Sequence, residues 1–161
     1  MLEKQLAVYR SCHQKMFTKI THLFGVPLLI FGIFTVMNWL ELTVHGVGSA
    51  PVTWLAIILV TLYYCLFDWQ LALMTGAWML ILALISFFWI GIIPSIKGFY
   101  VFLTCLFVGW LFQIIGHIFE RRKPALIDNA WHIFSAPIFI TLEVANWCGL
   151  KKGLLSQSTF D

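Results

Sequence analysis

The sequence predicts an all-α integral membrane protein, a bundle of four to five transmembrane helices with an N-terminal interfacial helix. Hydrophobic residues make up 61% of the 161 residues and charged residues only 11%, which is far more apolar than an ordinary soluble chain. Four segments contain no Asp, Glu, Lys or Arg: residues 20–40, 42–67, 69–96 and 98–119. Each is long enough to cross a hydrocarbon core about 30 Å thick. A soluble core of this composition would leave too little polar surface to cover it.

The interfacial helix is expected at residues 1–21. These residues mix Lys4, Arg10, Lys15 and Lys19 with apolar side chains, as basic helices on a bilayer surface do. The first membrane span is expected to follow at about residues 22–42. Its Pro27 would then lie in the first turns, where a helix tolerates proline.

Three further spans follow in order. A polar loop at residues 45–51 leads into the second span, at about 52–67. Asp68 marks a tight turn into the third span, at about 69–93, and a loop with proline and glycine then precedes the fourth, at about 99–118.

A fifth apolar segment, at about residues 130–149, contains Pro137 and carries polar side chains. A full fifth span would place Lys151 and Lys152 on the side opposite most other cations. We therefore favour a segment that is bent or half-inserted near Pro137. The chain, residues 1–161, is predicted to be a single membrane domain with its helical bundle at 22–149 and a polar tail at 150–161.

The Lys and Arg residues predict the orientation. Four of the ten precede residue 22 and three lie at residues 121–123, whereas the loop at 45–51 has none. Because cytoplasmic loops carry an excess of Lys and Arg, a cytoplasmic N-terminus places seven of the ten on that side. The net charge of +3 therefore needs no nucleic-acid partner. Short loops favour a bacterial inner membrane, with the endoplasmic reticulum membrane as the alternative.

Four of the five histidines fall at the cytoplasmic edge under this topology: His13, His22, His117 and His132. Each one alone is explained as an ordinary interfacial residue. Together they come from three distant parts of the chain, and Fe, Zn and Cu favour several imidazole ligands. His45 falls on the opposite side, about 30 Å away. The sequence thus predicts a metal site at the cytoplasmic edge.

Carboxylates accompany these histidines at helical spacing. His117 and Glu120 are three residues apart and share a helix face. Asp128 and His132 are four apart and do the same if a helix begins near residue 128. Glu143, three turns beyond His132, falls on the same stripe. A carboxyl inside a span indicates function, and the alternative is that it serves as a structural partner for a neighbouring Tyr, Trp or His.

His13 and His22 are nine residues apart, which turns an ideal helix by about 180°. On one straight helix they would point in opposite directions. We therefore predict a break near Thr18–Thr21, where the interfacial helix bends into the first span.

A set of short motifs surrounds these residues, in this order along the chain: Tyr9, His13, His22, Val26-Pro27, Gly116-His117, Phe119-Glu120, Pro124 to Asn129, Ala136-Pro137 and Glu143. Together they resemble the motifs of the membrane-bound 2-hydroxy fatty acid dioxygenases, named for metabolism of phytosphingosine to odd-numbered fatty acids. The resemblance covers most of the chain and keeps the order of its parts. Three departures exist. Gln14-Lys15-Met16 stands where members often carry an Asn-Pro pair, the gap from His117 to Glu120 is three where relatives can have four, and His132 is not a histidine in every member.

The resemblance implies an Fe(II)-dependent enzyme of fatty-acid α-oxidation. It would convert a long-chain 2-hydroxy fatty acid and O2 to the acid one carbon shorter, with loss of CO2, in contact with membrane lipid. The implied iron-ligand candidates are His13, His22, His117 and His132. Glu120 and Asp128 would orient imidazoles or bind the iron themselves, and Asn129 would form a hydrogen bond with the substrate or a ligand. The substrate head group would be attracted by Arg121, Arg122 and Lys123. The oligomeric state is not determined by the sequence.

Two other classes of protein stay open. A b-type haem protein would use two histidines from facing helices, and a Soret band would reveal it. A non-catalytic lipid-binding or transport protein would bind no metal and would use the polar stripe through Glu143. Di-iron desaturases need many more histidines than the five present here.

Overall fold

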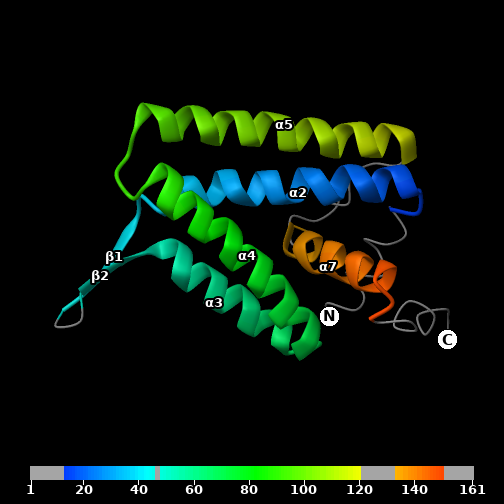
Figure 1. Cartoon of the computed structure of the whole chain (residues 1–161), viewed down its shortest axis with the longest axis horizontal. Helices are drawn as coiled ribbons and strands as arrows, with labels where there is room; N and C mark the ends of the chain where they lie inside the picture. The colour runs from blue at the N-terminus through cyan, green and yellow to red at the C-terminus, as the bar shows by residue number, and fades with distance from the viewer. Residues whose placement is uncertain (1–12, 46–47, 121–132, 151–161) are drawn as a thin grey trace.

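The computed structural model describes residues 13–45, 48–120 and 133–150, and the account below concerns these residues. Their elements, in chain order, are α2 (Met16–Met37), β1 (Glu41–Val44), β2 (Gly48–Pro51), α3 (Val52–Cys65), α4 (Trp69–Ile90), α5 (Ile96–Glu120) and α7 (Ser135–Trp147). Figure 1 shows α2 and α5 side by side, α3 and α4 as a hairpin of helices, and α7 as a short separate helix.

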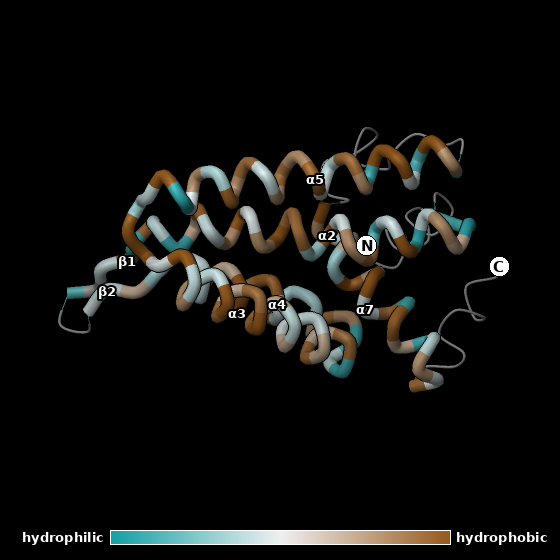
Figure 2. Tube along the Cα trace, turned by 45° about the horizontal axis from the view of Figure 1, so that its top comes forward, coloured by the Kyte–Doolittle hydropathy of each residue, from teal (hydrophilic) through white to brown (hydrophobic). Residues whose placement is uncertain are grey.

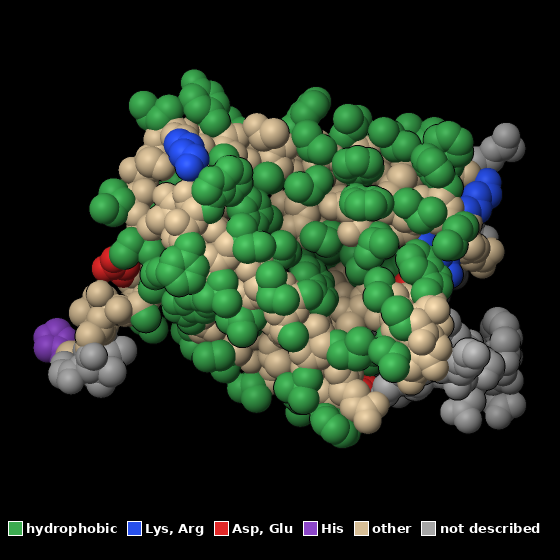
Figure 3. All heavy atoms as spheres, viewed as in Figure 1, with side chains coloured by type: hydrophobic (Ala, Val, Ile, Leu, Met, Phe, Trp, Pro, Cys, Tyr) green, Lys and Arg blue, Asp and Glu red, His purple; other side chains and the backbone are tan. Residues whose placement is uncertain are grey.

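The predicted all-α membrane fold is confirmed. Helices α2, α4 and α5 are each long and apolar enough to cross a membrane. Helix α3 has 14 residues, or about 21 Å, which is shorter than a full crossing requires. Figure 2 shows hydrophobic residues around the helices, and Figure 3 shows apolar side chains over much of the visible surface. Such a continuous apolar surface suits contact with lipid tails.

A β-hairpin takes the place of the end of the first predicted span and of the polar loop, and α3 begins at Val52, where the second span was expected. Strands β1 and β2 pair antiparallel, from Glu41 opposite Pro51 to Val44 opposite Gly48. The exposed His45 follows β1 at the end of α2 that is opposite Met16 (Figure 1). The hairpin therefore keeps His45 far from the start of α2, as expected.

Glycines bring α2 and α5 into close contact. A Cβ atom on Gly25 would lie 3.0 Å from the carbonyl oxygen of Gly109, and one on Gly109 would lie 3.0 Å from the carbonyl oxygen of Gly25. Small residues of this kind let membrane helices approach backbone to backbone. The two helices run antiparallel, so the start of α2 meets the end of α5 (Figure 1).

Asp68 forms the predicted tight turn between α3 and α4. Its backbone is extended, and its Oδ1 accepts hydrogen bonds from the N–H groups of Gln70 and Leu71 at 2.9 and 3.0 Å. This is the usual way in which an aspartate caps the start of a helix. The cap directs α4 back across the membrane in the same direction as α2.

Helix α7 lies in the opening between α2 and α4 (Figure 1) and contacts both. Its 13 residues span about 20 Å, too short for a full crossing. Pro137 lies in its first turn, where a missing N–H group costs no intrahelical bond. A half-inserted segment that begins near Pro137 agrees with this geometry. Lys151 and Lys152 lie outside the described residues, so the side of the C-terminus stays a prediction.

Two expectations about the start of the chain are wrong. Helix α2 runs without a break from Met16 to Met37, so the bend predicted near Thr18–Thr21 and the helix boundary after residue 21 are not found. His13 lies outside the helix instead, because the backbone of Lys15 is extended and α2 begins only at Met16. Pro27 consequently sits in the middle of α2 rather than in its first turns, where it leaves the Leu23 carbonyl without an intrahelical donor.

Candidate metal centre

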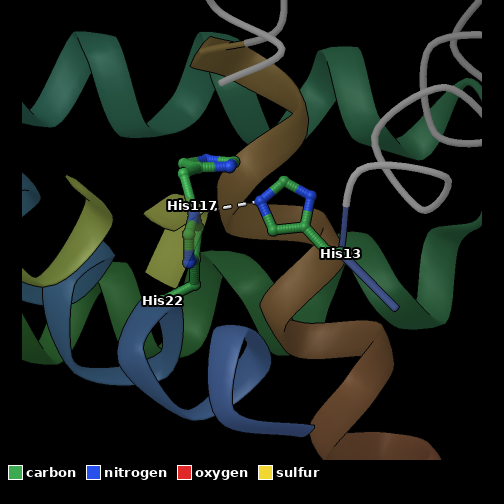
Figure 4. A group of neighbouring side chains, drawn as sticks. All are labelled: His13, His22 and His117. Atoms are coloured by element: carbon green, nitrogen blue, oxygen red, sulfur yellow. Dashed lines mark hydrogen bonds between the residues drawn. The ribbon is translucent and has the colours of Figure 1, made fainter. Parts of the chain in front are cut away.

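Three histidines converge where the start of α2 meets the end of α5. His13 precedes α2, His22 lies on α2, and His117 lies near the end of α5 (Figure 4). One ring nitrogen of each lies within 4.8 Å of the others, and the side chains are only 1%, 1% and 7% exposed. Among the described residues this is the only group of three or more His, Cys, Asp or Glu side chains placed to hold a metal ion. We call it the histidine triad.

The orientation of His22 is fixed by its own helix. Its Nδ1 lies 2.9 Å from the carbonyl oxygen of Thr18. Because a carbonyl can only accept, Nδ1 must carry the proton, and the Nε2 of a neutral His22 therefore presents a lone pair to the triad. The Nε2 of His13 lies 2.9 Å from that atom and donates to it. A metal ion would replace this shared proton.

His117 carries the clearest sign that the triad suits a cation. Its Nδ1 is buried and has no hydrogen-bond partner among the described residues. A buried polar atom without a partner is costly. The ring centroid of His117 lies 4.9 Å from those of both His13 and His22, with the rings edge to face. Three imidazoles so placed fit Fe, Zn or Cu and leave coordination positions open for other ligands.

Glu120 ties the segment that bears His13 to α5. Its Oε1 accepts a hydrogen bond from the N–H of Gln14, and its Oε2 accepts one from the N–H of Lys15, each at 3.0 Å. The hydroxyl of Thr18 donates to the same Oε2 at 2.7 Å. The sequence predicted that Glu120 holds an imidazole N–H or ligates. The structure gives it the N–H groups of Gln14 and Lys15 and the hydroxyl of Thr18 as partners, so its carboxylate holds the main chain next to His13.

The two helix ends satisfy each other's unpaired groups. The first N–H groups of a helix and the last carbonyls lack partners within the helix. Glu120, the last residue of α5, serves the N–H groups that lead into α2, and the Nζ of Lys15 donates to the carbonyl of Phe119 at 2.7 Å. An anion at a helix start and a cation at a helix end are also favoured by the helix dipoles.

Thr18 and Gly116 set the spacing between the helices at the triad. The Thr18 hydroxyl is 3.1 Å from the carbonyl oxygen of Gly116. A Cβ atom on Gly116 would overlap the Oγ1 of Thr21 and lie 3.2 Å from the His22 ring. Sequence reasoning assigned no role to Thr18. Its position four residues before His22, which places its carbonyl next to that ring, is the signal that was missed.

Glu143 has a cation as its partner. The Nζ of Lys19 on α2 lies 2.9 Å from its Oε2, and the two side chains are 22% and 7% exposed. The sequence left Glu143 either functional or structural and did not identify Lys19. On the same helix, Phe139 packs against the His13 ring with 5.5 Å between ring centroids. Helix α7 thus contributes one wall of the triad and an ion pair beside it.

The expectation that His117 and Glu120 share one helix face is confirmed, since both are buried against α2. The other predicted site residues lie outside the described residues: Arg121, Arg122, Lys123, Asp128, Asn129 and His132. Their roles stay predictions. The structure therefore brings together three of the four predicted metal ligands and places Glu120 beside them.

Comparison with known proteins gives one family. Residues 1–147 match the family Mpo1-like, described as 2-hydroxy-palmitic acid dioxygenase Mpo1-like. The 2-hydroxy-palmitic acid dioxygenase MPO1 of Saccharomyces cerevisiae is 30% identical over 146 residues, which cover 88% of this chain and 78% of the yeast protein. No solved structure matches the chain. The match extends over the elements that carry the histidine triad, and the chain belongs to the Mpo1-like family.

Proposed function

We propose that this protein is an Fe(II)-dependent dioxygenase of fatty-acid α-oxidation. It converts a long-chain 2-hydroxy fatty acid and O2 to the fatty acid one carbon shorter, CO2 and water. The observation that carries the proposal is the buried histidine triad at the end of the apolar bundle, in a chain of the Mpo1-like family. The membrane is proposed to be a bacterial inner membrane, with the triad at its cytoplasmic edge.

The reaction balances without an external reductant. The bond between C1 and C2 breaks, C1 leaves as CO2, and C2 is oxidised from a secondary alcohol to a carboxylic acid. The substrate gives up four electrons in total, which reduce one O2 fully. No flavin or reductase partner is therefore required.

The triad fits the proposed metal because its three rings are buried and close together, and because the buried Nδ1 of His117 has no hydrogen-bond partner among the described residues. His13, His22 and His117 would hold the iron, and His132 is the fourth candidate. When bound, ferrous iron supplies a redox centre for O2 and open positions for the substrate's carboxylate and hydroxyl.

The chain's own residues prepare this site. Thr18 fixes the tautomer of His22, so its Nε2 faces the centre. Glu120 holds the backbone after His13 against α5, and the burial of all three rings limits access of water. Arg121, Arg122 and Lys123 are proposed to attract the carboxylate head group. Asp128 and Asn129 are proposed to orient a ligand or the substrate.

The location also suits the proposed substrate. A long-chain 2-hydroxy acid keeps its tail in the bilayer and its head at the interface. The triad lies where α2 begins and α5 ends, next to the charged side chains of Lys15 and Lys19. The reacting carbon atoms of a membrane-embedded substrate can therefore reach the triad without extraction of the tail.

The haem alternative fits the triad less well. His22 and His117 do face each other from α2 and α5, but their ring centroids are only 4.9 Å apart. The His13 ring lies 4.3 Å from that of His22, which fills the space beside them. A macrocycle between the two rings would require the helices to separate.

The deciding experiment is metal analysis of the detergent-purified protein, with an optical spectrum of the same sample. We expect non-haem iron in the wild type, its loss in His117→Ala, and its retention in His45→Ala, which changes a histidine at the opposite end. Turnover of a 2-hydroxy fatty acid under O2 should follow the iron. A Soret band would support the haem class. Absence of any metal and of turnover would favour lipid binding or transport.

A further inference from the structure

An apolar groove of about 380 Å³ lies between α2, α4 and α7. Helix α2 contributes Leu23 and Pro27, α4 contributes Trp78 and Ile81, and α7 contributes Val144 to its walls. Ile81 is 56% exposed, so this side of the groove opens toward the surrounding lipid. The groove exists because the short helix α7 does not fill the whole opening between α2 and α4 (Figure 1).

Thr141 and Trp78 are the polar side chains in the groove wall, and their hydrogen-bonding groups are already paired within the protein. The Nε1 of Trp78 donates to the Oγ1 of Thr141 at 2.9 Å. That same hydroxyl lies 3.0 Å from the carbonyl of Pro137 and 2.8 Å from the hydroxyl of Thr75. Because these groups already satisfy one another, the wall presents hydrocarbon. Its chemistry matches an alkyl chain and not a polar ligand.

The groove and the neighbourhood of the triad share wall residues. Leu23, next to His22 in the chain, lines the groove and also a small hollow, too narrow for a water molecule, beside the ion pair of Lys19 and Glu143. Val144 borders both in the same way. Phe139 borders that hollow and packs on the His13 ring. Polarity therefore falls along one path of adjoining side chains, from imidazoles and an ion pair to hydrocarbon.

We propose that this groove binds the acyl tail of the 2-hydroxy fatty acid while its carboxyl end lies at the histidine triad. The proposal rests on the proposed function and adds where the tail lies. The order of polar and apolar surfaces along the path is that of a single-chain anionic amphiphile. Lys19 places a positive charge at the polar end, where it pairs with Glu143.

The groove selects its occupant by shape more than by affinity. Lipid tails are as apolar as the groove wall, so transfer of a tail from bilayer to groove gains little hydrophobic free energy. Its effect is to align the chain with C1 and C2 at the triad, which favours reaction of tails that fit. Narrowing the groove should therefore change the preferred chain length more than the overall binding.

The first test is photolabelling of the full chain in lipid nanodiscs without O2. The probe is 2-hydroxy-palmitic acid with a diazirine toward its methyl end, and the sites are mapped by mass spectrometry. We expect labels on Trp78, Ile81 and Val144 that excess unlabelled 2-hydroxy-palmitic acid removes. Labels spread evenly over lipid-facing helix surfaces, and unaffected by the competitor, would mean that bilayer lipid alone occupies the groove and would overturn the proposal.

The second test compares two identical substitutions on α4. Ile81→Trp adds bulk to the groove, whereas Ile85→Trp adds the same bulk at an exposed position that does not line it. We expect Ile81→Trp to shift the ratio of turnover toward shorter 2-hydroxy acids and Ile85→Trp to leave the ratio unchanged. Equal ratios in both variants and the wild type would count against a tail groove.

The two proposals fail in different ways. If the wild type turns over no 2-hydroxy acid of any length, the proposed function is wrong, and competed labelling still decides whether the groove holds an acyl chain. If turnover is found but labelling is not competed and chain-length ratios do not change, only the groove assignment is wrong.

Discussion

Glu120 and Lys15 are 105 positions apart in the chain and are joined by reciprocal hydrogen bonds. The carboxylate of Glu120 accepts the backbone N–H of Lys15 at 3.0 Å, and the Nζ of Lys15 donates to the carbonyl next to Glu120 at 2.7 Å. This reciprocal pairing closes the start of α2 onto the end of α5. It places His13, which precedes the helix, beside His22 and His117.

Glu120→Gln should weaken iron binding without unfolding the protein. An amide can accept one backbone N–H but turns its own NH2 group toward the other donor. One N–H group at this partly buried contact then loses its partner, which costs at most ~1–3 kcal/mol. Substitution of a residue that supports a metal ligand typically lowers the metal affinity by about 10- to 100-fold. Iron titration measures the effect, and Glu41→Gln in the exposed hairpin is the matched control. Equal affinities for the two variants would contradict the role given to Glu120.

Gly116→Ala should push α2 away from α5 at the triad. The added methyl overlaps the Oγ1 of Thr21 and crowds the His22 ring, and overpacking of this kind costs ~1–3 kcal/mol. We expect a lower thermal unfolding midpoint and reduced iron content. Thr21→Ala combined with Gly116→Ala removes the overlapping atom and should recover part of both. Additive losses in the double variant would show that the crowding is not at Thr21.

The pairing of Lys19 with Glu143 should be structural. Lys19→Met leaves Glu143 buried without its cation, and breaking a buried pair costs up to ~3–5 kcal/mol, reduced here because Lys19 is partly exposed. Replacing both residues, as Lys19→Met with Glu143→Leu, should recover stability in thermal unfolding and retain iron. Recovery of stability with lost iron would instead give Glu143 a role at the metal.

Removal of the metal should destabilise the protein in a way that depends on the triad. A ligand that binds only the folded state raises the unfolding midpoint by mass action. We expect a chelator to lower the midpoint of the wild type and of His45→Ala, and added Fe(II) to restore it. His22→Ala should respond to neither. A response of His22→Ala equal to that of the wild type would place the metal elsewhere.

Much of the fold can be read from the sequence, because membrane insertion depends on local hydrophobicity. The long stretches without charge correspond to α2, α4 and α5, and Asp68 marks the observed turn. The prediction failed where backbone hydrogen bonds decide the outcome. The hairpin of β1 and β2, which replaces the end of the first predicted span and the polar loop, was not predicted, and α2 starts at Met16 without a later bend.

For the site, topology and the histidine count led to His13, His22 and His117, and helical spacing placed His117 and Glu120 on one face. The sequence alone determined which histidines come to the same end of the helical bundle, since the lengths of the apolar segments and the positions of the charges set where each helix begins and ends. Only the tertiary structure decided what they contact. Glu120 binds the backbone of Gln14, 106 positions away, and Lys19 pairs with Glu143 because glycines bring α2 against α5 and α7 packs beside them. Such contacts depend on the distance between helices, which no local pattern in the sequence specifies.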